Sequence, residues 1–536
     1  MSVVARTHAV TAWNGRGPLG LPLLVALTLA VVSGWVMDLG HPDTNLWPLT
    51  LVGAALMIFA ARGLSVRSSL LVGAVGGFSY YGIHIWWLTV YLGPVPWFGL
   101  TIAQTAFFAL GFALLTLAWR WIPQLWSGPV GTLGMLPTVL ASIWLLRESV
   151  SGVWPSGGFN WARLAHSQSE TPLTPLVAWV GPGVFSFILA WLSAFGVVLW
   201  LEHRVSRQSR AALALAVVTA LVVWPAFPTT ISGHMSVAAI QGNADAGLFA
   251  QYERGDNLRD HHLVTQRIYG EQVDVVVWPE NASDIDPLRD EMAAAIANEV
   301  VREMDAPLVV GTITRDGDET FNSVLLWEED GQGGSGASDQ YDKIHPVPFA
   351  EYLPARELIY PLAPELFDLV PRDYSFGTRD TVFSIDSHTA GIAICYDIVD
   401  DAIFAQMMDE GADIIFAPTN NADFGRTDQS LQQLAIARLR AVELGRSVVN
   451  ISTVGTSAII TPEGKDLDRL PTYTEGYMIE RVPTATHTTP AARWGKQWEW
   501  WLIALGLSAL AIAGSRRHSP VRASVRDAGL LNPPGR

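Results

Sequence analysis

The chain is 536 residues long, and 50% of its residues are hydrophobic while only 16% are charged. This composition, with a mean hydropathy of +0.26, excludes a wholly soluble enzyme. The formal charge of -16 argues against a nucleic-acid partner, because phosphate binding needs a basic surface. The single cysteine, Cys395, excludes an internal disulfide and a zinc site built from thiolates.

Apolar residues are concentrated in the first 233 residues. Seven runs there have the length of about 16 to 25 residues that crosses a bilayer core. They are residues 19–37, 46–61, 69–87, 96–118, 130–146, 176–201 and 211–227, and an eighth run covers 498–514. The first run lacks a clear small-residue cleavage site, so we expect a retained anchor rather than a signal peptide. The sequence therefore predicts a polytopic α-helical membrane bundle of about eight spans.

The arginines predict the orientation of this bundle. Arg62, Arg67, Arg120 and three arginines within 204–210 occupy alternate loops, whereas the loops at 38–45 and 93–95 carry neither lysine nor arginine. Loops rich in basic residues stay in the cytoplasm. The tail after the eighth run is also rich in arginine. We therefore expect both termini to be cytoplasmic and the polar block between the seventh and eighth runs to lie outside.

In that polar block, short apolar runs typical of strands are interspersed with segments whose apolar residues recur at the helical spacing of three and four. The strand-like runs are 236–241, 273–278, 307–313, 322–327, 389–394, 414–417, 447–452 and 457–461, and the helical patterns are 258–270, 288–304, 399–410 and 430–444. A Gly/Ser-rich segment at 331–338 predicts a flexible hairpin loop. The block reads as one α/β domain, so we divide the chain into residues 1–233, 234–493 and 494–536.

Two charged residues of the block are candidates for catalysis. Glu280 follows an apolar strand in the motif Trp-Pro-Glu, at the strand end where open α/β sheets bind ligands. The alternative is an exposed loop glutamate or a neighbour of a helix N-cap. Lys343 is informative because only three of the 34 basic residues are lysine. It offers a compact ammonium where arginine cannot, although a solvated lysine is the alternative.

Cys395 directly follows the apolar run 389–394, at the point where a helix is expected to begin. The dipole of that helix would lower the pKa of the thiol and expose a thiolate. The alternative is a cysteine that fills the core. A thiolate can attack an ester, a carboxylate can take and return the proton, and an ammonium can stabilise the oxyanion. These roles suit Cys395, Glu280 and Lys343.

The order of Glu280, Lys343 and Cys395 resembles the catalytic triad of the carbon-nitrogen hydrolase (nitrilase) superfamily. With seven predicted spans before this domain and one after it, the chain resembles the apolipoprotein N-acyltransferase family. Further motifs of that family are Gln-Gly-Asn at 241–243, Asn-Asn-Ala at 420–422 and the arginine-rich stretch 438–446. The resemblance implies an αββα sandwich, a positioning carboxylate at Glu351, and support of the thiol pocket by Tyr396 and Asp397.

Three positions depart from the family pattern. Asp397 stands where glutamate is common, Ala350 replaces a glycine, and Asp423 stands where an aromatic residue often follows Asn-Asn-Ala. The side chain of Asp397 is one methylene shorter than that of glutamate. The change at Asp423 bears on the contact with the acyl chain or on the choice of acceptor.

The resemblance also implies the substrates and the location. A membrane phospholipid would give its acyl chain to Cys395, and the amino group of a diacylglyceryl-modified lipoprotein cysteine would accept it, at the bacterial cytoplasmic membrane. No metal or organic cofactor is expected. Catalysis at the membrane avoids extracting a lipid, at about 0.8 kcal/mol per CH₂. The apolar segment 358–362 is either an arm toward the lipid or a loop packed on the core.

Two other functions remain open from the sequence. A membrane-tethered amidase or nitrilase would use the same triad and release the acyl group to water. A transporter with a non-catalytic outer domain would need ionisable residues within its spans, which offer little beyond His84.

Overall fold

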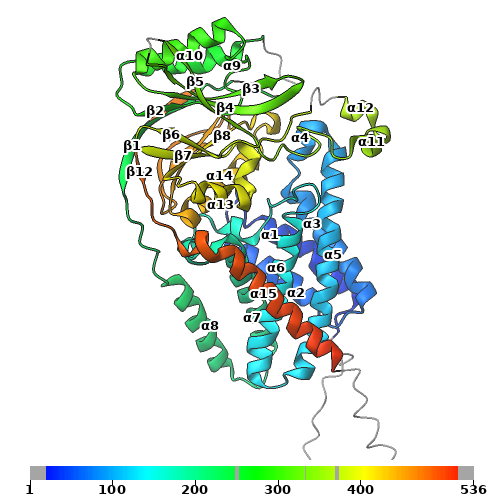
Figure 1. The fold of residues 1–536 in the computed structure, drawn as a ribbon. Coiled ribbons are helices and arrows are strands. Elements are labelled where there is room, and N and C mark those ends of the chain that lie inside the picture. The colour runs from blue at the N-terminus through cyan, green and yellow to red at the C-terminus, as the bar shows by residue number, and fades with distance from the viewer. Residues whose placement is uncertain (1–19, 245, 248–252, 332–333, 369–372, 517–536) are drawn as a thin grey trace, which may run out of the picture.

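The structure is a computed structural model that describes residues 20–244, 246–247, 253–331, 334–368 and 373–516. It consists of a bundle of long helices and a domain of two sheets with flanking helices (Figure 1). Arg522 and Arg526 of the basic tail, on which part of the predicted orientation depends, lie outside the described residues.

Helices form at all eight predicted apolar runs. They are α1 (Leu23–Asp38), α2 (Pro48–Ala60), α3 (Val66–His84), α5 (Pro94–Leu125), α6 (Leu136–Ser151), α7 (Val177–Leu201), α8 (Arg207–Val222) and α15 (Pro490–Ser515). Among the described residues, four helical segments are long and apolar enough to cross a membrane: Pro94–Leu125, Gly131–Ser151, Thr174–Leu201 and Pro490–Ser515. Leu23–Asp38 and Pro48–Ala60 are shorter apolar helices. The protein is thus a membrane protein with several apolar helices.

The second part contains two six-stranded sheets. The first has the strand order β12-β1-β2-β3-β4-β5 and the second the order β11-β10-β9-β8-β7-β6. The strands of the first are β1 (Gly233–Gln241), β2 (Val275–Val277), β3 (Leu308–Asp316), β4 (Glu319–Glu329), β5 (Ser335–Asp342) and β12 (Gly476–Thr484). Those of the second are β6 (Val382–Ile385), β7 (His388–Ile392), β8 (Ile414–Thr419), β9 (Ser447–Ser452), β10 (Ser457–Ile460) and β11 (Asp466–Leu470). In each sheet the three central strands are parallel neighbours.

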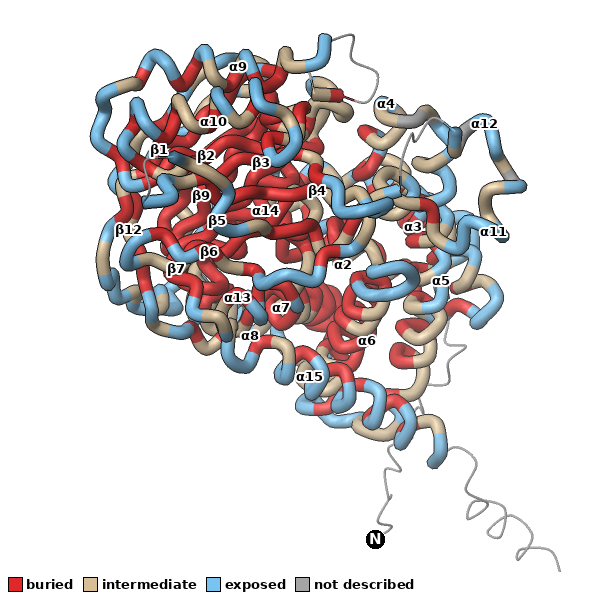
Figure 2. The backbone as a smooth tube through the Cα atoms, turned by 45° about the horizontal axis from the view of Figure 1, so that its top comes forward, coloured by how far each residue is buried: buried red, intermediate tan, exposed pale blue. Residues whose placement is uncertain are grey.

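The two sheets pack face to face through a largely apolar core. Val237, Val277 and Val309 of the first sheet meet Ile392, Phe416 and their neighbours of the second. The outer face of the first sheet is covered by α9 (Asp256–Thr265) and α10 (Glu291–Met304), and that of the second by α13 (Asp401–Asp409) and α14 (Gln429–Leu444). Figure 2 shows the sheets largely buried and the outer sides of α9 and α10 exposed. The layers follow the expected αββα order.

The sequence missed four strands, and each lacks a clean apolar pattern. Strands β6, β11 and β12 were not predicted. Strand β5 begins at Ser335, inside the segment 331–338 that was predicted to be a flexible loop, so that prediction is wrong for its second half. All four are edge strands, where a single neighbour and a solvated face permit polar residues.

Candidate active site

Three strand ends bring the predicted catalytic residues together. Glu280 follows β2, Lys343 follows β5, and Cys395 follows β7 of the opposite sheet. All three line one cavity of about 710 Å³. The close approach of β3 to Glu280 requires Gly311, because a Cβ there would lie 2.2 Å from the Pro279 carbonyl oxygen. A small residue at this point lets the loop after β2 fold over the sheet edge.

Lys343 is the centre of the charged site. Its side chain is only 1% exposed, and its Nζ lies 2.9 Å from Oε2 of Glu351 and 3.5 Å from Oε1 of Glu280. Glu280 is 4% exposed. A buried ammonium between two carboxylates is not a solvated lysine, and Glu280 is not an exposed loop residue. The structure therefore excludes a solvated lysine and an exposed glutamate at these two positions.

Asn322 is a site residue that the sequence analysis missed. Its Nδ2 donates to Glu280 at 2.7 Å and to Glu351 at 3.0 Å, so one amide holds both carboxylates. The backbone N–H of Val347 also donates to Glu351, at 2.6 Å. Asn322 lies in β4 within the predicted strand 322–327. The position of polar Asn322 in a largely apolar strand could have identified it as a candidate site residue.

The environment of Cys395 contradicts the expected thiolate. The residue opens the short 3-10 helix η6 (Cys395–Val399), while the α-helix α13 begins only at Asp401. Burial and the charge of Glu280 raise the pKa of the thiol to about 12, although Lys343 acts in the opposite direction. The prediction of a pKa lowered by a helix dipole is wrong. The resting side chain is therefore a buried thiol whose pKa Glu280 helps to raise.

Cys395 also has partners that the sequence did not suggest. Thr419, the last residue of β8, lowers the pKa of the thiol in part. Gln433 of α14 donates to the carbonyl oxygen of Cys395 at 3.2 Å and to the hydroxyl of Thr419 at 2.8 Å. The Cys395 backbone has a φ of 51°, in the left-handed region. These bonds hold a backbone conformation that an L-residue adopts rarely.

Asp397 is fully buried below the thiol turn, and its shorter side chain reaches its partners. It accepts hydrogen bonds from the Tyr341 hydroxyl at 2.9 Å and from the backbone N–H of Ile394 at 3.1 Å. Burial raises its pKa to about 7, against the opposing effects of Lys343 and Tyr341. Asp397 thus ties the turn to β5 and does not line the cavity.

Tyr396 lies on the other side of the turn. Its ring stacks on Trp161 with a centroid distance of 6.3 Å, and its hydroxyl donates to the Gly158 carbonyl oxygen at 3.3 Å. Both partners lie in the loop between α6 and α7, so Tyr396 contacts the helical bundle instead of the cavity.

The cavity extends from the triad to the helical bundle. Tyr91 of the short helix α4 (Leu88–Leu92) lines it together with Phe424, and their rings lie 6.0 Å apart. Ala350 and Asp423, two of the departures from the family pattern, line the same cavity. The Leu358 side chain is 75% exposed on α11 (Arg356–Ile359), so it does not pack on the core.

Within the described part of the chain, no group of three or more His, Cys, Asp or Glu side chains is arranged to hold a metal ion. Near the thiol, the carboxylates of Glu280 and Glu351 and the ammonium of Lys343 line the cavity, and Asn322 holds the two carboxylates without lining it. Their arrangement suits proton transfer and the stabilisation of a developing negative charge.

Comparisons with known proteins cover both parts of the chain. The carbon-nitrogen hydrolase family matches residues 236–490, and the apolipoprotein N-acyltransferase N-terminal domain matches residues 33–195. Among solved structures, Saccharomyces cerevisiae Nit3 of the nitrilase superfamily is similar at 19% identity and a TM-score of 0.35. That similarity covers 47% of this chain and 91% of Nit3.

Curated relatives extend over nearly the whole length. The apolipoprotein N-acyltransferase of Mycolicibacterium smegmatis is 30% identical over 529 residues, which cover 91% of this chain and 85% of the relative. That of Azotobacter vinelandii is 30% identical over 513 residues, which cover 92% and 95%. With both of its parts matched and relatives of this similarity along its length, the chain belongs to the apolipoprotein N-acyltransferase family.

Proposed function

We propose that the enzyme moves an acyl chain from a membrane phospholipid to Cys395, and then to the amino group of a diacylglyceryl-modified lipoprotein cysteine. One observation carries this proposal: Glu280, Lys343 and Cys395 line a single cavity that also reaches Tyr91 of the helical bundle. A lipid lying among the membrane helices could thus present its ester to the thiol without leaving the bilayer.

In the first half-reaction, the sulfur of Cys395 attacks the ester carbonyl while Glu280 takes the thiol proton. This concerted transfer suits a thiol with a raised pKa, because no thiolate has to form beforehand. Lys343 stabilises the oxyanion. The tetrahedral intermediate then expels the lysophospholipid oxygen, which takes the proton from Glu280 and leaves a thioester.

In the second half-reaction, the neutral amine of the acceptor attacks the thioester carbonyl. Glu280 removes a proton from the attacking nitrogen, and Lys343 again stabilises the oxyanion. The sulfur leaves and regains its proton from Glu280, so the resting enzyme is restored. Glu351 and Asn322 act through Lys343 and Glu280, whose positions they fix.

Burial raises the pKa of Glu280, with Lys343 lowering it only in part. Glu280 must be ionised to act as a base. The rate of the first half-reaction should therefore rise with pH through the raised pKa of Glu280.

We also propose the topology that the arginines predict: eight spans, both termini in the cytoplasm, and residues 234–493 outside as the catalytic domain between parts 1–233 and 494–536. The start of β1 at Gly233 and the eight helices at the apolar runs support this division. Reporter fusions after Trp224 test it. An active cytoplasmic reporter at that point would contradict the orientation and the lipoprotein substrate.

The function is tested with the full chain in phospholipid vesicles and a diacylglyceryl-cysteine peptide. Mass spectrometry should find the peptide N-acylated and an equal amount of lysophospholipid. Release of free fatty acid with an unmodified peptide would instead indicate a membrane-tethered hydrolase. Glu280→Gln is the matched control, since it removes the base without changing the size of the side chain.

A further inference from the structure

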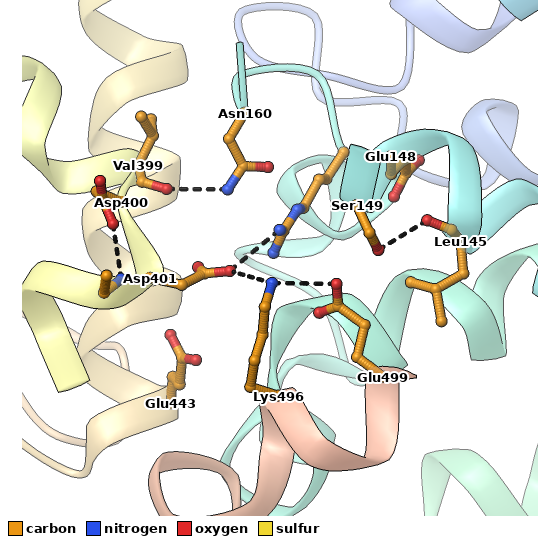
Figure 3. A network of polar contacts seen from close by, with 12 residues as sticks. Leu145, Glu148, Ser149, Asn160, Val399, Asp400, Asp401, Glu443, Lys496 and Glu499 are labelled. Atoms are coloured by element: carbon orange, nitrogen blue, oxygen red, sulfur yellow. Dashed lines mark hydrogen bonds and ion pairs between the residues drawn. The ribbon is translucent and has the colours of Figure 1, made fainter. Parts of the chain in front are cut away.

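A cluster of six charged side chains joins the catalytic domain to the membrane helices. Its members, which line a small cavity of about 70 Å³, are Arg163, Asp401, Arg440, Glu443, Lys496 and Glu499. Three cations balance three carboxylates. Figure 3 shows Asp401 beside Lys496, whose amine lies between Asp401 and Glu499. No residue that lines this small cavity also lines the catalytic one, so the cluster lies outside the catalytic cavity.

Asp401 is the residue on which the cluster converges. Its Oδ2 lies 3.1 Å from Nη2 of Arg163 and 3.2 Å from Nζ of Lys496, and its Oδ1 lies 2.8 Å from Nη2 of Arg440. Arg163 belongs to the loop between α6 and α7, and Lys496 belongs to α15. Arg440 belongs to α14 of the catalytic domain. One carboxylate therefore pairs with cations from both parts of the protein.

The same cluster holds the turn that carries the thiol. Asp401 is the first residue of α13, which follows directly after η6 (Cys395–Val399). Nε of Arg440 donates to the Ile398 carbonyl oxygen at 3.0 Å. From the bundle side, Nδ2 of Asn160 donates to the Val399 carbonyl oxygen at 2.9 Å (Figure 3). The end of the nucleophile turn is thus held by the catalytic domain and by the helical bundle.

On the membrane side, the cluster lies at a close crossing of α7 and α15. A Cβ at Gly183 would lie 2.1 Å from Oε2 of Glu499, so the two helices approach closely at this point. Glu499 is nearly fully buried and pairs with Lys496 at 3.2 Å. Lys496, which reaches Asp401, therefore belongs to a helix that packs closely against its neighbour.

We propose that Asp401 and Lys496 are positioning residues that hold Cys395 at a fixed place relative to the membrane helices. The inference rests on the proposed function, since it assumes that Cys395 is the nucleophile. A lipid anchored in the bilayer cannot follow a displaced thiol, whereas a small ester dissolved in water can. A misplacement of about 1 Å can cost on the order of 10²-fold in rate. Loss of the cluster should therefore slow the reaction with bilayer lipid selectively.

The test compares two acyl donors on the full chain reconstituted in phosphatidylethanolamine and phosphatidylglycerol vesicles. One donor is the vesicle lipid and the other is water-soluble p-nitrophenyl butyrate. In the second case the sulfur of Cys395 forms a bond to the butyryl carbon, p-nitrophenolate leaves, and Glu280 takes the thiol proton. Intact-protein mass reports the acyl group gained from either donor.

Lys496→Met is the informative variant, because Lys496 is partly exposed and its loss leaves Asp401 two other cations. We expect loading from vesicle lipid to fall on the order of 10-fold or more, and loading from p-nitrophenyl butyrate to stay within about twofold of the wild type. Lys496→Arg should restore most of the lipid reaction. Arg493→Met is the matched control, since Arg493 is exposed on the same helix and has no ion pair in the described structure.

Two results would overturn the positioning role. Equal losses from both donors would show that Lys496 only stabilises the protein, and unchanged loading from both would show that the cluster does not position the thiol. A wild-type protein that gains no mass from either donor would instead refute the nucleophile assignment of Cys395. Failure of the inference and failure of the proposed function are therefore distinguishable.

Discussion

Replacing Lys343 with methionine removes the cation that lies between Glu280 and Glu351 and roughly keeps the length of the side chain. At 2.9 Å, two opposite charges attract by about 6 kcal/mol at an effective dielectric of 20. Desolvation offsets part of this attraction, and breaking a buried pair typically costs about 3–5 kcal/mol because one charge is left buried and unpaired. We expect Lys343→Met to lower the melting temperature by about 10 °C at pH 8.

The loss should be smaller at low pH. Without Lys343, the pKa of Glu280, already raised by burial, rises further. A folded-state pKa above that of the unfolded chain gives stability that is present at low pH and lost as the pH rises through the folded value. Melting curves in detergent at pH 5 and pH 8 measure this difference.

Activity should fall independently of stability. Removing an oxyanion donor costs on the order of 10²- to 10³-fold in rate. The double variant Lys343→Met/Glu351→Gln removes both charges of the shorter of the two ion pairs of Lys343. It should therefore recover stability relative to Lys343→Met, while acyl loading stays lost. Lys465→Met, at an exposed lysine, is the control. The reasoning is refuted if Lys343→Met melts like the wild type at pH 8, or if it loads acyl groups at a near-normal rate.

Three further changes test the remaining site residues. Asn322→Leu removes the amide that holds Glu280 and Glu351, so acyl loading should fall about 10-fold or more while the melting temperature drops only slightly. Loading equal to that of the wild type would show that Asn322 has a structural role alone. Glu280→Gln removes a charge that raises the pKa of Cys395, so iodoacetamide should alkylate the thiol faster at pH 8. Acyl loading should fall by about 10²-fold or more, because the base is missing. Slower alkylation would contradict the electrostatic account of the thiol pKa. The pKa of Asp397 is raised to about 7, so the stabilisation that its protonated form gives to the folded protein is complete below about pH 4 and lost as the pH rises through 7. Asp397→Asn should therefore flatten the fall in melting temperature between pH 5 and pH 8. An unchanged slope would contradict the raised pKa.

The sequence predicted the parts of the fold that buried apolar residues determine. The parallel strands β2, β8 and β9 are short and fully buried, so their composition differs from that of any loop. The helices α10 and α14 pack one face on a sheet and carry the helical period. Strands such as β11, with the sequence Asp-Leu-Asp-Arg-Leu, are partly solvated at an edge and have no comparable signal.

The candidate site was predictable where a residue type is rare or stands at a strand end, as with Lys343, Glu280 and Cys395. The properties of these residues were not, because they depend on neighbours far away in the sequence. The pKa of Cys395 is set by burial and by Glu280, which precedes it by more than a hundred residues, and a local argument from a helix dipole gave the wrong sign. The contact of Asp401 with Lys496 likewise depends on how the two parts of the protein pack.

The most direct test of the account is the mass of the intact protein after incubation with phospholipid alone. The wild type should gain one acyl group, and after removal of the donor it should pass that group to a diacylglyceryl-cysteine peptide and return to its original mass. Cys395→Ala should gain nothing and transfer nothing. The account is contradicted if the wild type transfers acyl groups without ever gaining mass, or if Cys395→Ala still acylates the peptide.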